Sequence, residues 1–571
     1  EEHADLLRPG VLLAPGSILT RLREVMTEDA CQDVEIIGWL YQFYISEKKD
    51  QVFAGLKKNQ KITAENIPAA TQLFTPHWIV RYLVENSLGR LWLLNRPQSK
   101  LAAKMDYHIA PEEPEPDFLR ITQPEEIRIC DPACGSGHML TYAFDLLYEI
   151  YSEEGHDAAE IPGLILQHNL TGVEIDDRAG ALAAFALAMK AAARLGRRRF
   201  LRMEVKPDIV VLQDVRFTPA EMQDVAAVVG KDLFTDELRE TLGQFEQAKN
   251  FGSLIVPKLR DPAETLRVVE ARDFGSDLLL KEVQTRVVGV LCMAEALSPK
   301  YHVVVANPPY MGGKGMNGGL GEFAKAKYPD SKTDLFAMFM ERALCLTAQR
   351  GIMAMINMQS WMFLSTFESL RQKILSEASI QSMLHLGERA FDSIGGAVVS
   401  TTAFTVKKLR DHVAGTFFRL VDGRSEAEKI KLFEDSYKQQ SANLVFRVSS
   451  EYFEKIAGFP IAYWASKKCI DVFSQLEKVG DRAVKGLDTN GNIDEFLRLW
   501  FEVSSKKTTP ESTTRRWYPI SKGGTFRRWG GNAEFVIDYS NNGARLRANK
   551  ANLRSEDRYG LDGATWSVVS T

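Results

Sequence analysis

The string VVVANPPY at residues 303–310 places an amide, two prolines and an aromatic ring directly after an apolar run. Asn307 supplies an amide oxygen, and the main-chain carbonyl of Pro308 supplies a second acceptor beside it. Because Pro308 and Pro309 restrict the backbone and carry no N–H donor, both acceptors are held in fixed positions. Two adjacent acceptors match the two hydrogens of a planar amino group, and Tyr310 offers a flat face for stacking. The string therefore predicts a site that positions a planar NH₂ group, with Asn307, Pro308, Pro309 and Tyr310 as its catalytic residues.

A second string, ICDPACGSGHML at residues 129–140, places a glycine-rich turn between an apolar run and a helical pattern. Gly135 and Gly137 allow a sharp turn and a close approach of the backbone to a ligand. The helix that opens near His138 adds free N–H groups at the same place. In doubly wound sheets, ligands bind beside such turns, at the carboxyl ends of the strands. The candidate ligand contacts in this string are Asp131, Ala133, Gly135 and Gly137.

Two more carboxylates follow the next two apolar runs. Glu174 in TGVEIDD can accept hydrogen bonds from both hydroxyls of a ribose, as acidic residues do in dinucleotide-binding folds. Asp214 in DIVVLQDV can accept from the amino group of an adenine. The alternative is that both are loop carboxylates without a ligand. Because they stand at strand ends in series with Asp131, we favour a single crevice that binds a nucleoside.

The spacing of the apolar runs predicts the elements that position these residues. Short runs alternate with longer helical patterns, which is typical of a mostly parallel α/β sheet covered on both faces. We therefore predict a doubly wound, mostly parallel, Rossmann-like sheet. The expected strands are 127–130, 170–175, 208–212, 301–306, 351–356, 382–386 and 399–406.

The chain of 571 residues is too long for one core, so several regions are expected. The α/β alternation ends at about residue 411, and a tail rich in Gly, Asn, Trp and Arg begins at about 485. We expect the chain to be incomplete at both ends. The predicted regions are a helical N-terminal region (1–70), the ligand-binding α/β domain (71–410) with a helical insertion at about 216–300, a connector (411–484), and the truncated start of an α+β recognition region (485–571).

Two loops carry expectations of their own. The segment from about 100 to 126 contains PEEPEPDF and is rich in Pro and Glu, which is typical of a surface loop. The glycine-rich string MGGKGMNGGLG at residues 311–321 lacks the spacing of a phosphate-binding loop. Because it follows NPPY, we expect a mobile loop over the site.

Composition restricts the class of protein. Hydrophobic residues make up 45% and charged residues 26% of the chain, as in ordinary soluble proteins. No apolar run reaches the roughly 20 residues of a membrane span, and the N-terminus lacks a signal-peptide pattern. Six cysteines without a CxxC pair argue against disulfides and against a metal site, so we expect a reducing, cytoplasmic compartment and no metal. A net charge of −4 leaves nucleic-acid binding open, because local basic patches contact phosphates.

These strings, in this order, resemble the gamma class of N6-adenine DNA methyltransferases. The resemblance implies that S-adenosylmethionine is the cofactor and also contacts Asn307. It implies that the methyl group goes to the N6 amino group of an adenine flipped out of double-stranded DNA.

Two further segments resemble parts of that class. LFTPHWIVRYLVENSLG at residues 73–89 is similar to its leading cofactor segment, which implies that Thr75 and Pro76 contact the methionine part of the cofactor. FDSIGGAVVSTTAF at residues 391–404 is similar to its late segment, which implies that Phe391 forms the second wall of the base pocket.

A closer resemblance is to the PglX-type methyltransferases of BREX phage-defence systems, a family of much longer chains. It rests on GWLYQFYISEKKDQVF near the N-terminus, the FTP segment, and KGGTFRRWGGN in the tail. It implies site-specific DNA methylation in a phage-defence system, with other defence proteins as partners and no membrane.

The tail at residues 513–532 alternates Arg with aromatic residues, which suits phosphate contacts and base stacking. A surface hairpin stabilised by Arg–aromatic packing is the alternative. The DNA-contact candidates are Arg515, Arg516, Trp517, Arg527, Arg528 and Trp529.

Three other functions remain open. A protein glutamine-amide methyltransferase would use the same NPPY string, because a side-chain amide also presents a planar NH₂ group. A DNA-recognition subunit of a defence assembly would bind the cofactor but depend on partners for turnover. A restriction-modification fusion would carry its own nuclease, for which residues 1–70 contain no persuasive motif.

Overall fold

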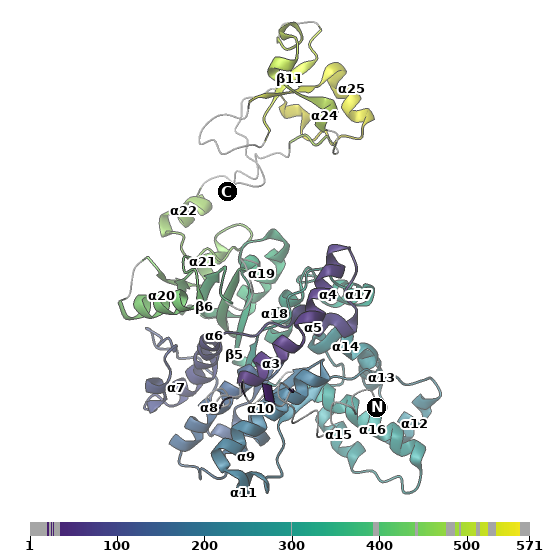
Figure 1. Cartoon of the computed structure of the whole chain (residues 1–571), viewed down its shortest axis with the longest axis vertical. Coiled ribbons are helices and arrows are strands. Elements are labelled where there is room, and N and C mark those ends of the chain that lie inside the picture. Colours follow the sequence, from purple (N-terminus) through teal and green to yellow (C-terminus); the bar gives the residue numbers. More distant parts are fainter. Residues whose placement is uncertain are drawn as a thin grey trace. The chain divides into compact units, whose positions relative to one another are not determined.

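The computed structural model describes residues 35–298, 300–391, 399–439, 443–475, 486–489, 491, 493–509, 514–522 and 533–559, with residues 17, 20, 21, 24 and 27 before them. The chain divides into two compact units, Glu1–Ile470 and Asp471–Thr571. Figure 1 shows the elements of both units. The functional division of the chain into four regions stays a prediction.

The first unit is built on one nine-stranded sheet in the order β3-β2-β1-β4-β5-β7-β6-β8-β9. The strands from β3 to β5 run parallel, β7 is antiparallel to both β5 and β6, β8 is parallel to β6, and β9 is antiparallel to β8. The predicted fold class is therefore confirmed. The strand order reverses at β1, which is where such sheets open a ligand crevice. The strands are β1 (Ile129–Asp131), β2 (Leu170–Glu174), β3 (Asp208–Val211), β4 (Tyr301–Ala306), β5 (Thr347–Met358), β6 (Ser379–Gly387), β7 (Thr401–Lys407), β8 (Ala414–Arg419) and β9 (Val445–Ser449).

Each strand expected from the sequence is present, and the sheet also continues beyond them. The α/β alternation was expected to end at about residue 411, but β8 and β9 lie after that point and belong to the same sheet. That expectation was wrong because β8 pairs directly with β6, from which it is separated in the sequence by β7, and β9 then pairs with β8. Their place in the sheet depends on that long-range pairing.

Two apolar cores lie on the two faces of the sheet, and β4 contributes to both. Val303 and Val305 belong to one core, whereas Val304 and Ala306 belong to the other. Central parallel strands that are buried on both faces form continuous apolar runs, which is why VVVA predicts this strand so well.

Helices pack on both cores. The core that contains Val303 is covered by α6 (His77–Val84), α7 (Arg90–Asn95), α8 (His138–Glu153), α9 (Ile161–His168), α10 (Asp177–Leu195) and α20 (Glu426–Gln439). The core that contains Val304 is covered by α12 (Glu221–Val229), α13 (Asp236–Gln244), α14 (Ala248–Phe251), α15 (Pro262–Glu270), α16 (Leu278–Ala296), α17 (Gly318–Lys327), α18 (Leu335–Leu346), α19 (Glu368–Glu377) and α21 (Glu451–Glu454). The described part of the segment between β3 and β4 is mostly helical, as predicted for the insertion. The remaining helices of the unit are α3 (Glu35–Tyr44), α4 (Ser46–Lys57), α5 (Ile67–Thr71) and α11 (Arg197–Phe200), and α22 (Lys467–Gln475) contains the boundary between the two units.

The Pro- and Glu-rich connector is more than a surface loop. Glu115 is buried and pairs with the buried Arg90, with its second oxygen 3.2 Å from Lys407 Nζ. The amide of Gln381 donates to the same oxygen at 3.1 Å. The surface-loop expectation was therefore wrong at this residue, because composition describes the segment as a whole and does not reveal one buried carboxylate.

The second unit contains a small antiparallel sheet in the order β10-β12-β11, beside α24 (Ile493–Phe496) and α25 (Ser540–Ala548). Its strands are β10 (Leu497–Leu499), β11 (Trp517–Ile520) and β12 (Phe535–Asp538). Phe496, Leu497, Ile537 and Leu546 form its apolar core. Over the residues that the structure describes, no helix combines the length and the hydropathy needed to cross a bilayer.

Candidate active site

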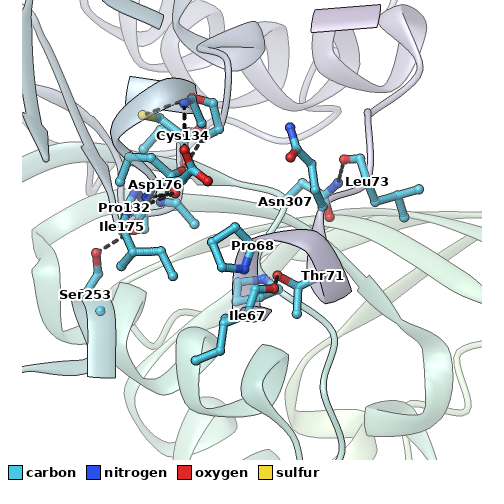
Figure 2. Close-up of a pocket in the computed structure, with 18 of the residues that line it drawn as sticks. Ile67, Pro68, Thr71, Leu73, Pro132, Cys134, Ile175, Asp176, Ser253 and Asn307 are labelled. Atoms are coloured by element: carbon cyan, nitrogen blue, oxygen red, sulfur yellow. Dashed lines mark hydrogen bonds between the residues drawn. The ribbon is translucent and has the colours of Figure 1, made fainter. Parts of the chain in front are cut away.

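A pocket opens at the carboxyl ends of β1 and β4, where the strand order reverses. Asp131, Ala133, Gly135, Glu174 and Asn307 all line it, as does Thr75. Side chains from several separate segments of the chain surround the space in Figure 2, with the Asn307–Leu73 hydrogen bond on one side and Ile67, Pro68 and Thr71 near the centre. The structure therefore brings together residues from four of the predicted strings.

The glycine-rich turn after β1 has the backbone that the sequence requires. Gly135 and Gly137 have φ values of 53° and 85°, in the left-handed region. A Cβ atom at Gly137 would lie 3.0 Å from Cβ of Ala183, so this glycine also allows α8 to begin against α10. The turn can thus approach both a ligand and the neighbouring helix.

Glu174 is fastened by backbone N–H groups at the end of β2. One carboxylate oxygen accepts from Gly135 at 2.8 Å, and the other accepts from Ile175 at 2.8 Å and Asp176 at 3.0 Å. Burial raises the pKa of Glu174, whereas these three hydrogen bonds stabilise the ionised carboxylate and oppose that rise. The oxygen bonded to Gly135 keeps acceptor capacity for a ligand hydroxyl.

Asp131 lies deeper in the same pocket and is almost fully buried. One of its oxygens accepts from the backbone N–H of Ala133 at 3.0 Å. Burial, and then the negative charge of Glu174, raise the pKa of Asp131 to about 8. Ionising both Asp131 and Glu174 is costly, because they are buried and their negative charges repel each other. A ligand that carries positive charge lowers this cost, so the pair favours such a ligand.

Asn307 has a fixed orientation at the end of β4. Its amide nitrogen donates to the carbonyl of Leu73 and to Oγ1 of Thr75, both at 3.0 Å. Its amide oxygen is buried and has no hydrogen-bond partner. Because both hydrogens of the amide are engaged by the segment around Thr75, the oxygen is presented as an acceptor.

The side chain of Tyr310 is fixed by contacts of its hydroxyl and of its ring. Its hydroxyl donates to the carbonyl of Ile356 at 2.9 Å, and its ring meets Phe336 edge to face at 6.1 Å between centroids. The side chain is half-buried. Pro309 lines the pocket, whereas Pro308 and Tyr310 lie outside its lining.

The glycine-rich segment after Tyr310 is anchored at several points. Gly315 accepts from the backbone of Ile62 at 2.9 Å, and Met311 donates to Asp334 at 3.0 Å. Met316 is buried. These contacts tie the segment to distant parts of the chain, and its predicted mobility stays a prediction.

Several lining residues come from segments that sequence reasoning did not single out. The helical insertion contributes Asn250, Phe251 and Ser253, and α18 contributes Leu335 and Phe339. Ser253 donates to the carbonyl of Pro132 at 2.5 Å, which fixes the insertion against the glycine-rich turn. In the sequence these residues belong to ordinary helical patterns, so only the folded chain shows that they reach the pocket.

Four further candidates lie outside the pocket lining. Asp214 is exposed and accepts from the backbone N–H of Lys249 at 2.9 Å. Pro76 precedes α6, and Gly137 begins α8. Phe391 is buried in the core that contains Val303, directly before residues 392–398, which lie outside the described residues. The roles predicted for these residues stay predictions.

The DNA-contact candidates of the tail lie partly within and partly outside the described residues. Arg516 pairs with the buried Asp538 at 2.8 Å, and Trp517 is itself buried, so both stabilise the second unit. The guanidinium of Arg515 lies 4.1 Å from the ring centroid of Tyr518. This arrangement favours the Arg–aromatic packing alternative for these three residues, whereas Arg527, Arg528 and Trp529 lie outside the described residues.

The described part of the chain contains no group of three or more His, Cys, Asp or Glu side chains that could hold a metal ion. The pocket therefore offers amide, carboxylate, backbone and aromatic groups as its chemical inventory.

Comparison with known proteins places these features in a wider context. Residues 168–391 match a family model described as the Eco57I restriction-modification methylase. The adenine-specific methyltransferase BrxX of Escherichia coli O9:H4 (strain HS) is 45% identical over 604 residues, which cover 100% of this chain and 49% of that protein. The adenine-specific methyltransferase PglX of Lacticaseibacillus casei (strain Zhang) is 39% identical over 577 residues, which cover 94% of this chain and 47% of that protein.

A solved structure shows a more distant similarity. A cryoEM structure of a DrdV–DNA complex matches with a TM-score of 0.39 and 16% identity, covering 69% of this chain and 31% of that chain. The chain spans about half the length of the curated relatives it matches.

Proposed function

This chain belongs to the family of adenine-specific methyltransferases that includes BrxX and PglX, and on that premise we propose that it methylates the N6 amino group of adenine in double-stranded DNA. The proposed cofactor is S-adenosylmethionine, and the proposed setting is a BREX-like phage-defence system with further defence proteins as partners. The observation that carries this proposal is the buried, unpartnered amide oxygen of Asn307 at the edge of a pocket lined by Asp131 and Glu174.

The pocket residues fit the proposed cofactor. Glu174 has acceptor capacity for ribose hydroxyls, and Phe251 and Phe339 offer apolar surface for a purine. Asp131 and Glu174 together favour the positive charge of the sulfonium and amino groups. Asp214 is the sequence-based candidate for the adenine amino group, and Thr75 and Pro76 are the candidates for the methionine part.

S-adenosylmethionine, when bound, supplies an electrophilic methyl group. We propose that the amide oxygen of Asn307 and the carbonyl of Pro308 accept the two hydrogens of the target amino group. Such bonding draws the nitrogen lone pair out of conjugation with the ring and directs it toward the methyl carbon. Because the donor is already activated, the protein contributes mainly orientation, and we propose that no metal ion is required.

The target base must leave the DNA stack to reach this site, at a cost of a few kcal/mol. Tyr310 is our candidate for stacking on the extruded adenine, and Phe391 is the sequence-based candidate for the opposite wall. The bond from the Tyr310 hydroxyl to Ile356 fixes the ring without using its face. A protein glutamine side chain would also fit between two acceptors, so the nature of the substrate needs a direct test.

The test uses labelled cofactor, DNA and nucleoside analysis for N6-methyladenine, with and without EDTA. We expect Asn307→Ala to lower methyl transfer by about a hundredfold or more, by analogy with the loss of one positioned transition-state contact. Cofactor affinity, measured by calorimetry, should change only a few-fold. Thr75→Val removes one acceptor that orients Asn307 and should give a smaller loss of transfer. Product formation by Asn307→Ala at the wild-type rate, or methylation of protein glutamine in place of DNA, would contradict the proposal.

A further inference from the structure

Three large apolar side chains are exposed beyond the carboxyl end of β5 and before α22. Phe363, Leu364 and Trp464 have exposed fractions of 37%, 52% and 43%. The rings of Phe363 and Trp464 meet at 5.5 Å between centroids, so two loops distant in sequence form one surface. We call Phe363, Leu364 and Trp464 the stacking surface. Contiguous exposed apolar groups of this kind mark binding sites.

A buried histidine lies under the stacking surface. The ring of His385 stacks with Trp464 at 6.0 Å between centroids and 25° between planes. Its Nδ1 lies 2.9 Å from the hydroxyl of Tyr463, and its Nε2 lies 2.8 Å from Oε1 of Gln359. Burial, with Arg419 and Lys429 nearby, lowers the pKa of His385 to about 4. The ring under Trp464 is therefore neutral at physiological pH and fixed on both sides.

A buried arginine joins the two loops that present the surface. Arg371 donates to the carbonyls of Trp361 and Leu364 at 2.8 Å from one nitrogen, and to the carbonyl of Gly458 at 2.6 Å from another. The backbone of Ile461 also donates to Met362 at 3.0 Å. The fully buried guanidinium of Arg371 therefore holds the two loops, and with them the exposed aromatic residues, in place. Such preorganisation is typical of a binding surface.

The stacking surface lies at the same edge of the sheet as the proposed base site. β4 and β5 run parallel, Asn307 follows β4, and Tyr310 bonds to Ile356 near the end of β5. Gln359, which contacts His385, is three residues beyond Ile356, or about 10 Å along an extended chain. Lys467 and Lys468 follow Trp464 and are exposed, so positive charge accompanies the aromatic rings.

We propose that the stacking surface contacts the DNA bases bordering the extruded adenine. This inference rests on the proposed function. Extrusion of one base leaves the faces of its neighbours without a stacking partner, and a flat aromatic group restores that contact whatever the sequence. Lys467 and Lys468 then lie where the phosphates of the same strand can be neutralised. The chemistry of the surface, aromatic with cations beside it, fits an opened DNA stack better than an apolar protein face.

The test compares two fluorescent DNA duplexes that differ only in one abasic site, which opens the stack without need of the target sequence. The whole chain is used, and affinity is measured by fluorescence anisotropy. We expect the wild type to prefer the opened duplex. The double variant Phe363→Ala with Trp464→Ala should lose about ten- to a hundredfold of affinity for it, as expected for lost base stacking. Binding to the intact duplex should change much less.

Three controls separate stacking from misfolding. Trp464→Phe keeps a ring and should keep most of the preference for the opened duplex. Phe185→Ala removes an aromatic side chain on α10 that is more exposed (52%) than Phe363 or Trp464, and it should change neither affinity. S-adenosylmethionine binding should persist in the double variant, because no residue of the surface lines the pocket.

Wild-type affinity of the double variant for the opened duplex would overturn the inference and assign the surface to a protein contact. Failure of the proposed function would give a different result. The wild-type chain would then form no N6-methyladenine or would not bind S-adenosylmethionine, whatever the DNA affinity of the Trp464 variants.

Discussion

Single residues in this pocket owe their chemistry to contacts that the sequence alone does not display. Asn307 is recognisable from its string, but its orientation follows from Leu73 and Thr75, more than 200 positions earlier in the chain. Glu174 was predicted as a ligand contact, and the structure adds that three backbone N–H groups fix its carboxylate. The residue types were therefore predictable, whereas their hydrogen-bond partners required the fold.

Asp131 gives a prediction about pH. Its pKa is raised to about 8, mainly by burial, so the free protein holds a proton there at neutral pH. Because this pKa lies above that of the unfolded chain, the residue lowers the free energy of unfolding as pH rises from about 4 to about 8. A cationic ligand favours the ionised form and should release up to one proton on binding below pH 8.

Calorimetry in buffers of different ionisation heat measures that proton. We expect the affinity for S-adenosylmethionine to rise with pH up to about 8 and then to level off. Asp131→Asn should remove most of the proton release. An observed binding heat that does not depend on the buffer at pH 7 would contradict the expected proton release from Asp131.

At the scale of elements, the central strands were predicted well because buried parallel strands are continuous apolar runs. β8 and β9 were missed because their placement depends on pairing with β6 and with each other. The insertion was correctly expected to be helical, but its contribution of Asn250, Phe251 and Ser253 to the pocket was not foreseen. Such a contribution requires knowledge of where a helix end lies in space, which helical periodicity does not provide.

The connector before β1 gives a prediction about stability. Glu115 is the buried carboxylate between Arg90 and Lys407, so its neutral replacement leaves the buried Arg90 without its carboxylate and Lys407 with Asp411 as its remaining ion-pair partner. We expect Glu115→Gln to lower the free energy of unfolding of the first unit by about 3–5 kcal/mol. Glu112→Gln is the matched control in the same connector, because its pair with Arg447 is exposed and should be worth less than about 1 kcal/mol. Urea denaturation followed by circular dichroism measures both, and equal effects of the two variants would refute a special role for Glu115.

At the scale of the whole chain, the two units have different expected tasks. The described residues that line the pocket fall between Ile67 and Phe339, all within the first unit. The second unit has its own small sheet and core, its Trp517 is buried, and its Arg516 pairs with the buried Asp538. We propose that this unit contributes to DNA recognition, in keeping with the sequence-based expectation for the tail, while cofactor binding needs only the first unit.

Removal of the second unit tests this division. A protein that ends at Ile470 should bind S-adenosylmethionine with a dissociation constant within about twofold of the whole chain, because a lost contact worth even 1.4 kcal/mol would change it tenfold. Its affinity for duplex DNA should fall, since basic and aromatic groups of the tail are removed together. Calorimetry with the cofactor and anisotropy with labelled DNA measure the two effects on the same preparation, and Asn307→Ala in the shortened protein should still bind the cofactor. A tenfold loss of cofactor affinity on shortening would place part of the cofactor site in the second unit, and unchanged DNA affinity would confine DNA binding to the first.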